Sequence, residues 1–118
     1  MNSAQAIQSF WGGFGWSAYD QHSVPDNAIL PYVTYDVVTD EFDSKAMSSG
    51  NLFDKSTSWA KLSEKLEEIS NAIGHGGKVI KTDKGAIWIT KGTPFARRSS
   101  ENDTIKQIII NIQTEFIE

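Results

Sequence analysis

The stretch Thr57 to Ile73, with the sequence TSWAKLSEKLEEISNAI, decides the fold class of this chain. Its apolar residues recur at spacings of three and four, which is the repeat of an α-helix with one apolar stripe. The stripe consists of Trp59, Leu62, Leu66, Ile69 and Ile73. Charged side chains occupy much of the remaining surface, so the stripe is narrow. Such a helix packs on the face of a sheet rather than in the middle of a helical bundle.

The helix has recognisable signals at both ends. Ser56 or Ser58 can accept a hydrogen bond from the exposed amides of the first turn, and Gly74 is a typical helix stop. The following run, Gly74 to Gly77, contains His75 and resembles a phosphate-binding loop in composition. Phosphate loops precede a helix, however, whereas this run follows one and lies at its negative end. We therefore interpret it as a helix stop and connector.

The sheet is predicted most clearly in the last third of the chain. Two short apolar stretches, residues 78–81 and 86–90, flank the turn from Thr82 to Gly85 and predict a β-hairpin. Residues Thr104 to Glu118 alternate over a long run and predict a long central strand. The polar stretch from Lys91 to Asp103, which contains Pro94, is predicted as a loop between them.

The first half of the chain supplies further elements. Residues Ser3 to Trp11 predict a short amphipathic helix, and Phe14 to Asp20 a brief extended stretch. Tyr32 to Phe42 is rich in β-branched and aromatic residues and predicts a strand. Ala46 to Lys55 is expected to return antiparallel to it, with a bulge or a longer tip at Ser48 to Asn51. Together these elements predict one α+β domain over residues 1–118, a mainly antiparallel sheet packed against two helices.

The composition excludes several classes of function. The 118 residues contain no cysteine, which excludes a disulfide scaffold, a thiol nucleophile and a Cys-ligated metal site, and the two histidines argue against a His-rich metal site. A formal net charge of −4 argues against binding nucleic acid through its phosphates, and the doublet Arg97-Arg98 alone is too small to change this. The apolar runs are too short to span a bilayer, and the start lacks the pattern of a signal peptide. We expect a soluble protein.

Catalytic motifs are not found in the sequence. No Gly-x-Ser-x-Gly, His-Glu-x-x-His or Walker pattern occurs, and neither His22 nor His75 lies in a recognisable catalytic motif. Asp40, Glu41 and Asp43 form an acidic cluster, but the spacing lacks the glycine and distal glutamate of a calcium loop. A solvated hairpin tip is the better interpretation of that cluster. We therefore expect a protein that is not an enzyme and that holds no cofactor or metal.

Aromatic residues are unusually dense near the amino terminus. Phe10, Trp11, Phe14, Trp16 and Tyr19 fall within ten residues. In a chain of this size most of them must be core residues. Part of the cluster can alternatively remain exposed and be covered by another subunit, because tryptophan and tyrosine are favoured as interface anchors.

Four short motifs carry a resemblance to a known family. They are Ser23-Val24-Pro25, Leu30-Pro31-Tyr32-Val33-Thr34-Tyr35, Ser56-Thr57-Ser58-Trp59 and Gly92-Thr93-Pro94-Phe95-Ala96. In these motifs, and over nearly its whole length, the chain resembles the tail terminator (tail completion) proteins of tailed bacteriophages and prophages of Gram-positive bacteria. The Leu-Pro-Tyr-x-Thr-Tyr and Ser-Thr-Ser-Trp segments are the most specific parts of the resemblance.

The resemblance implies a virion structural protein without catalytic activity. Such proteins form a ring, usually of six subunits, which caps the growing tail tube and ends its elongation. The finished tail then joins the head connector or closes the top of a headless contractile particle. The implied partners are copies of the chain, the tail tube protein, and the tail sheath and connector proteins. The implied location is the head-proximal end of the tail, after synthesis in the host cytoplasm.

A ring requires two different complementary patches on each subunit, and loops are the simplest places for them. The candidate interface segments are the tip from Asp40 to Leu52, the loop from Lys91 to Asp103, and the aromatic amino-terminal stretch. The candidate interface residues are Trp11, Phe14, Trp16, Arg97 and Arg98. If DNA passes through the lumen without sequence-specific binding, an acidic wall would let it slide. Asp40, Glu41 and Asp43 are therefore candidate lumen-facing residues.

Three alternatives remain open on the sequence alone. The first is another virion component, either a head-closure or connector protein or a minor tail protein. The second is a small monomeric binding module, such as a regulator. The third is a small hydrolase that uses His22 or His75.

Overall fold

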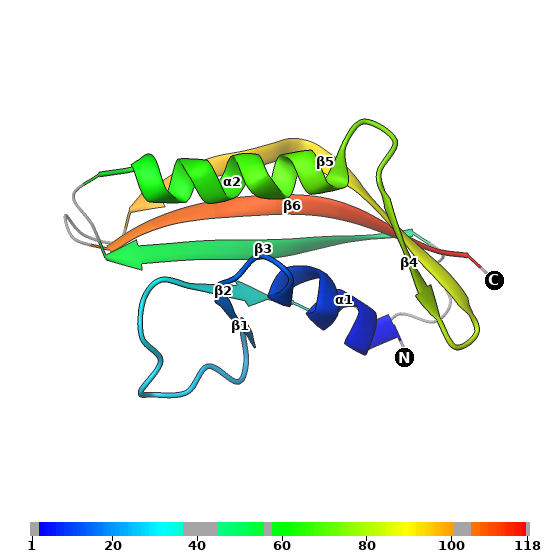
Figure 1. Cartoon of the computed structure of the whole chain (residues 1–118), viewed down its shortest axis with the longest axis horizontal. Helices are drawn as coiled ribbons and strands as arrows, with labels where there is room; N and C mark the ends of the chain where they lie inside the picture. The colour runs from blue at the N-terminus through cyan, green and yellow to red at the C-terminus, as the bar shows by residue number, and fades with distance from the viewer. Residues whose placement is uncertain (1–2, 37–44, 56–57, 101–104, 118) are drawn as a thin grey trace.

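The computed structural model describes residues 3–36, 45–55, 58–100 and 105–117. Within these residues two helices and six strands follow one another (Figure 1). Their bounds are α1 Ser3–Gly12, β1 Ser17–Asp20, β2 Tyr32–Tyr35, β3 Lys45–Lys55, α2 Ala60–Ile73, β4 Lys78–Thr82, β5 Gly85–Ser100 and β6 Ile105–Ile117. The predicted α+β class is confirmed.

All six strands belong to one sheet with the order β1-β2-β3-β6-β5-β4. Neighbouring strands are antiparallel except for β1 and β2, which are parallel. β6 lies at the centre between β3 and β5, as its alternating sequence predicted. β1 and β4 form the two edges of the sheet.

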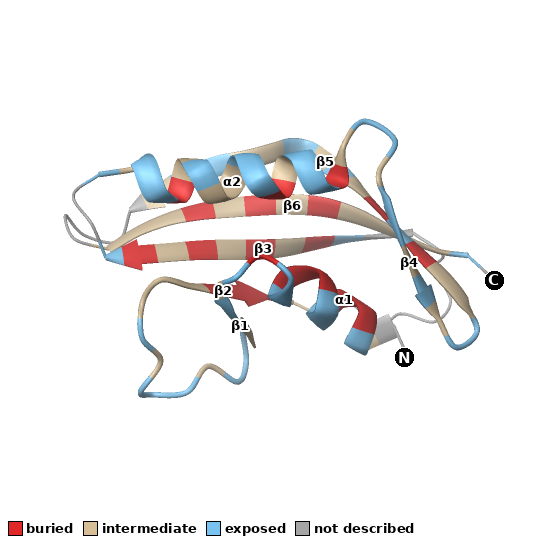
Figure 2. Cartoon of the chain, viewed as in Figure 1, coloured by how far each residue is buried: buried red, intermediate tan, exposed pale blue. Residues whose placement is uncertain are grey.

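Both helices cover the same face of the sheet. On this face β6 presents Ile108, Ile110 and Ile112, which are all buried. The α2 stripe lies against it with Leu62, Ile69 and Ile73 fully buried, so the periodicity of the sequence identified the contact face. In Figure 1 α2 runs above β6 and α1 lies below β3, and Figure 2 shows the buried residues of both helices turned towards the strands.

The ends of α2 follow the predicted signals. Ser58 Oγ accepts a hydrogen bond from Ala60 N at 3.1 Å, at the start of the helix. Gly74 ends the helix with φ 68°, in the left-handed region that favours glycine, and its amide donates to Ser70 O at 2.9 Å. α2 begins at Ala60, so the predicted start is too early: Ser58 and Trp59 precede the helix, and Thr57 lies outside the described residues.

The predicted bulge at Ser48 to Asn51 is wrong. β3 pairs continuously with β6 from Lys45 to Lys55, and with β2 from Gly50 to Phe53. Gly50 is present for another reason, because a Cβ at this position would overlap the indole ring of Trp11. The absent side chain lets α1 approach the sheet closely, so this glycine is a packing residue inside a regular strand.

The predicted loop from Lys91 to Asp103 is also wrong where the structure describes it. β5 continues to Ser100, and residues 96–100 pair with β6. The pairing register shifts only between Lys91 and Ala96, around the cis Thr93–Pro94 peptide. Proline cannot donate to a ladder, so the chain bulges there and then resumes pairing.

The predicted strand from Tyr32 to Phe42 is described only in its first part. β2 covers Tyr32–Tyr35, and Asp36 follows it. Asp36 accepts hydrogen bonds through Oδ1 from Ser48 Oγ at 2.7 Å and from Ser49 N at 2.8 Å. The remaining residues of that prediction lie outside the described part of the chain.

Candidate assembly surfaces

Among the described residues, no helix lies over the second face of the sheet. Residues opposite one another on paired strands share a face, so the register assigns every side chain to one side. On β6 the uncovered side carries Ile109, Asn111, Gln113 and Glu115, and all of them are only partly buried. The sheet therefore offers a broad surface of mixed polar and apolar character.

Side chains on this face connect three strands by hydrogen bonds. Gln107 Nε2 on β6 donates to Asn51 Oδ1 on β3 at 2.9 Å, and Asn51 Nδ2 donates to Thr34 Oγ1 on β2 at 3.3 Å. Three rings lie next to this row, with centroid separations of 5.7 Å for Tyr19–Tyr32 and 5.5 Å for Tyr32–Phe53. Neither group was identified from the sequence, because only the register between β1, β2 and β3 brings these residues together.

Exposed apolar side chains gather at the β4–β5 end of the uncovered face. Val79 and Trp88 lie opposite each other on β4 and β5, with exposed fractions of 58% and 36%. Ile117 on β6 is 44% exposed and is paired with Ala86, which lies two residues before Trp88 on β5. We call Val79, Trp88 and Ile117 the hairpin patch.

Trp88 is held in place within this patch. Its Nε1 donates to Gly76 O at 2.8 Å, and a Cβ on Gly77 would overlap that same nitrogen. The glycine run after α2 thus lets the connector pass close to the indole, which agrees with its interpretation as a connector. A fixed, partly exposed tryptophan is typical of an interface anchor.

Another exposed apolar side chain, that of Ile29, lies at the other edge of the sheet, in the connection between β1 and β2. Ile29 is 81% exposed, the largest exposed fraction among the large hydrophobic side chains of the described residues. Local hydrogen bonds shape this connection: Ser23 N donates to Asp20 O at 2.8 Å and Ala28 N to Pro25 O at 3.1 Å. The side chain of Asp20 also accepts from His22 N at 2.9 Å.

The structure places two of the predicted interface aromatics in the core. Trp11 is fully buried and Phe14 is 9% exposed, and Phe10 packs edge-on against both with centroid separations of 5.0 and 5.3 Å. In the single chain Trp11 and Phe14 are therefore core residues, so for these two side chains the interpretation as core residues holds and the interpretation as exposed anchors does not. Trp16 remains partly exposed, with Lys65 Nζ 5.4 Å from its ring centroid.

The two predicted interface arginines lie on opposite faces of β5. The Arg98 guanidinium lies 4.8 Å from the ring centroid of Trp59, and Lys106 Nζ lies 5.2 Å from the same ring. Arg98 therefore attaches the start of α2 to the sheet. Arg97 is exposed on the uncovered face, opposite Ile109, where a neighbouring subunit can reach it. The predicted lumen residues Asp40, Glu41 and Asp43 lie outside the described residues.

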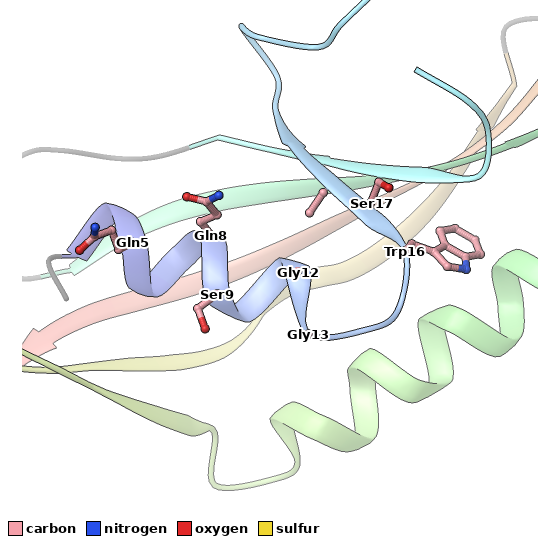
Figure 3. A pocket seen from close by; sticks show the side chains of 8 residues that line it. Gln5, Gln8, Ser9, Gly12, Gly13, Trp16 and Ser17 are labelled. Carbon is pink, nitrogen blue, oxygen red and sulfur yellow. The ribbon is translucent and has the colours of Figure 1, made fainter. Parts of the chain in front are cut away.

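The described residues offer little to a small-molecule ligand or a metal ion. A shallow depression between α1 and β1 is lined by Gln5, Gln8, Ser9, Gly12, Gly13, Trp16, Ser17 and Ala18, none of them charged (Figure 3). Within the described residues no three His, Cys, Asp or Glu side chains gather as metal ligands would. Burial, with a contribution from the charge of Asp20, raises the pKa of Tyr35, so this phenol is not activated as an acid or a nucleophile. The expectation that the chain is not an enzyme stays a prediction.

A solved structure matches this architecture from end to end. It is a chain of the "Virion of native gene transfer agent (GTA) particle", with a TM-score of 0.56 over 97% of this chain and 96% of that chain. This chain has the fold of a virion component. The two sequences are 15% identical, so the similarity concerns the fold alone.

Sequence comparisons give no closer assignment. Neither a family model nor a curated protein matches the chain. In the described residues, neither helix has the length and apolar character needed to cross a membrane.

Proposed function

We propose that the chain is a virion structural protein that forms a ring on the end of the tail tube, ends tube elongation and offers a docking surface to the head connector. The observation that carries this proposal is the similarity of fold, over nearly the full length of both chains, to a component of a gene transfer agent virion. The resemblance of the sequence motifs to tail terminator proteins supplies the more specific role.

The surfaces of the chain support a role in assembly. No described helix covers one face of the six-stranded sheet, and exposed apolar side chains lie at both of its edges. Exposed apolar residues rimmed by polar ones are typical of surfaces that bind other proteins. A ring needs two different patches on each subunit, and the hairpin patch and the β1–β2 connection lie on opposite edges.

In this role the chain acts through its shape. A ring of copies, expected to number six, would sit on the last layer of tail tube protein and occupy the surface on which the next layer would otherwise add. The opposite side of the ring would bind the connector and, in a contractile particle, the sheath. DNA would pass through the lumen without sequence-specific contacts, in agreement with the net charge of −4.

Deleting the gene from the phage or prophage that encodes the chain tests this proposal. Electron microscopy of the resulting particles should show abnormally long tails that are not joined to heads, together with normal heads. A plasmid copy of the wild-type chain should restore tail length. Normal tails joined to heads in the deletion strain would exclude the terminator role.

The head-closure or connector alternative predicts particles that differ from those expected for loss of a terminator. Loss of a head-closure or connector protein should leave tails of normal length that fail to join. The same deletion experiment therefore separates these roles through the length distribution of the tails.

A further inference from the structure

The charges of this chain are distributed very unevenly along its length. The first 44 residues contain six aspartate and glutamate residues and no lysine or arginine. All 11 lysines and arginines follow, together with the other nine acidic residues. Because β1 and β2 come from the first part and β4 and β5 from the second, the two edges of the sheet differ in charge.

The edge formed by β1 and its connection to β2 is acidic. Among residues 17–31 the charged side chains are Asp20, partly buried, and Asp26, which is exposed. The strongly exposed Ile29 follows Asp26 by three residues. This edge therefore presents an apolar side chain with negative charge beside it, and we call Asp26 and Ile29 the acidic knob.

The opposite edge, formed by the β4–β5 hairpin, is mainly basic. Lys78, Lys81 and Lys84 are exposed there, and the nearby acids are Asp83 in the turn and Glu115 on β6. Lys81 lies on the uncovered face in the same row as Ile117, two positions along β4 from Val79. This edge therefore presents the hairpin patch with positive charge around it.

The two edges do not contact each other on one chain, because α1 lies between β1 and β4. They terminate the strand order β1-β2-β3-β6-β5-β4. Figure 1 shows the β1–β2 connection at the lower left and the β4–β5 hairpin at the lower right of the molecule, at opposite ends of the view. Because α1 contacts both edge strands and stands between them, one copy cannot join its own two edges without refolding.

We propose that copies of this chain dock head to tail, with the acidic knob of one copy seated on the basic hairpin patch of the next. Ile29 would contact Val79 and Trp88, and Asp26 would pair with Lys78 or Lys81. Opposite charges at the two edges favour this arrangement, and like charges oppose a symmetric pairing of two identical edges. The inference rests on the proposed ring and names the contact that would close it.

A charge-exchange experiment tests this contact. One variant, Lys78→Glu with Lys81→Glu, makes both edges acidic. The other, Asp26→Lys with Asn27→Lys, makes both edges basic. Lys55→Glu with Lys61→Glu is the matched control, because it makes the same charge change at exposed residues of β3 and α2, away from the hairpin. Thermal unfolding followed by circular dichroism verifies that each variant is folded.

Light scattering coupled to size-exclusion chromatography at low salt gives the association state. We expect the wild type and the control to assemble alike, and each edge variant alone to associate at least about tenfold more weakly. An equal mixture of the two edge variants should assemble again, because their edges are complementary. The copies must then alternate, so only rings with an even number of subunits close. Added salt should weaken all of these assemblies.

Several outcomes would overturn the inference. It fails if either folded edge variant assembles as well as the wild type, if the mixture does not restore assembly, or if the wild type stays monomeric at low salt. Assembly of the Asp26→Lys, Asn27→Lys variant alone, with loss in the Lys78→Glu, Lys81→Glu variant, would indicate a symmetric contact between two hairpins instead. Tail length in cells separates this failure from that of the proposed function. If edge variants and wild type end tail growth equally well, the terminator role stands and the contact is wrong.

Discussion

The indole ring of Trp11 on α1 lies directly against the backbone of Gly50 in the middle of β3, at a distance that leaves no room for a Cβ. This contact connects the amino-terminal helix to the centre of the sheet. It also explains a glycine inside a strand that is paired on both sides.

Gly50→Ala should therefore destabilise the chain, because the added methyl group forces Trp11 or α1 to move. Overpacking of this kind costs about 1–3 kcal/mol in the free energy of unfolding, measured with urea. Gly12→Ala is the matched control, since a Cβ on Gly12 has no heavy atom within 4 Å. Equal stability of the Gly50→Ala variant and the wild type would show that Trp11 does not pack as described.

Arg97 and Arg98 give a comparison between two faces of one strand. Arg98→Ala removes the contact with Trp59 and should lower the free energy of unfolding by about 0.5–1 kcal/mol. Arg97→Ala should change it by less than about 0.5 kcal/mol, because Arg97 is exposed on the uncovered face. If chemical denaturation showed a larger loss of stability for Arg97→Ala than for Arg98→Ala, the assignment of the two arginines to opposite faces of β5 would be contradicted.

Lys65 connects α2 to the segment that follows α1. Its Nζ donates to Phe14 O at 2.5 Å and to Glu68 Oε2 at 2.6 Å, and its side chain is 16% exposed. Lys65→Met should lower the free energy of unfolding by about 1–2 kcal/mol, since hydrogen bonds of charged groups contribute more than neutral ones. Lys61→Met on the exposed side of the same helix is the control. Equal unfolding midpoints for the two variants would be incompatible with this connection.

Tyr35 gives a prediction for alkaline solution. Its pKa is raised above 10.0, first by burial and then by the charge of Asp20. The folded chain therefore retains a proton that the unfolded chain loses as the pH rises through 10, so stability from this group is present below that pH and falls above it. Tyr35→Phe should make the unfolding temperature less sensitive to pH in that range. If the unfolding temperature of the variant depended on pH as that of the wild type does, Tyr35 would not be the source of the loss of stability at alkaline pH.

Periodicity predicted the elements whose apolar residues face one surface. The stripe of α2 and the alternating isoleucines of β6 were identified because burial against a single layer enforces a repeat of 3.6 or 2 residues. The errors concern contacts that lie far apart in sequence. Gly50 was interpreted as a bulge because nothing near it in the sequence indicates that Trp11 covers it.

The same reason explains the second error. Residues 97–100 are polar and follow shortly after a proline, so the local sequence favours a loop, while pairing with the apolar central strand β6 makes them a strand. Of the predicted interface residues, Trp16, Arg97 and Arg98 are at least partly exposed in the structure. The hairpin patch was not predicted, because Trp88 alternates like a core residue and its exposure depends on the missing cover over one face.

Elongation of tail tubes in the presence of this chain tests the central claim most directly. Purified tail tube protein is allowed to polymerise with increasing amounts of the wild-type chain, and tube lengths are measured by electron microscopy. The account predicts shorter tubes as the chain is added, with its density at one end of each tube. Tubes that reach the same length at every concentration, with no density at their ends, would contradict it.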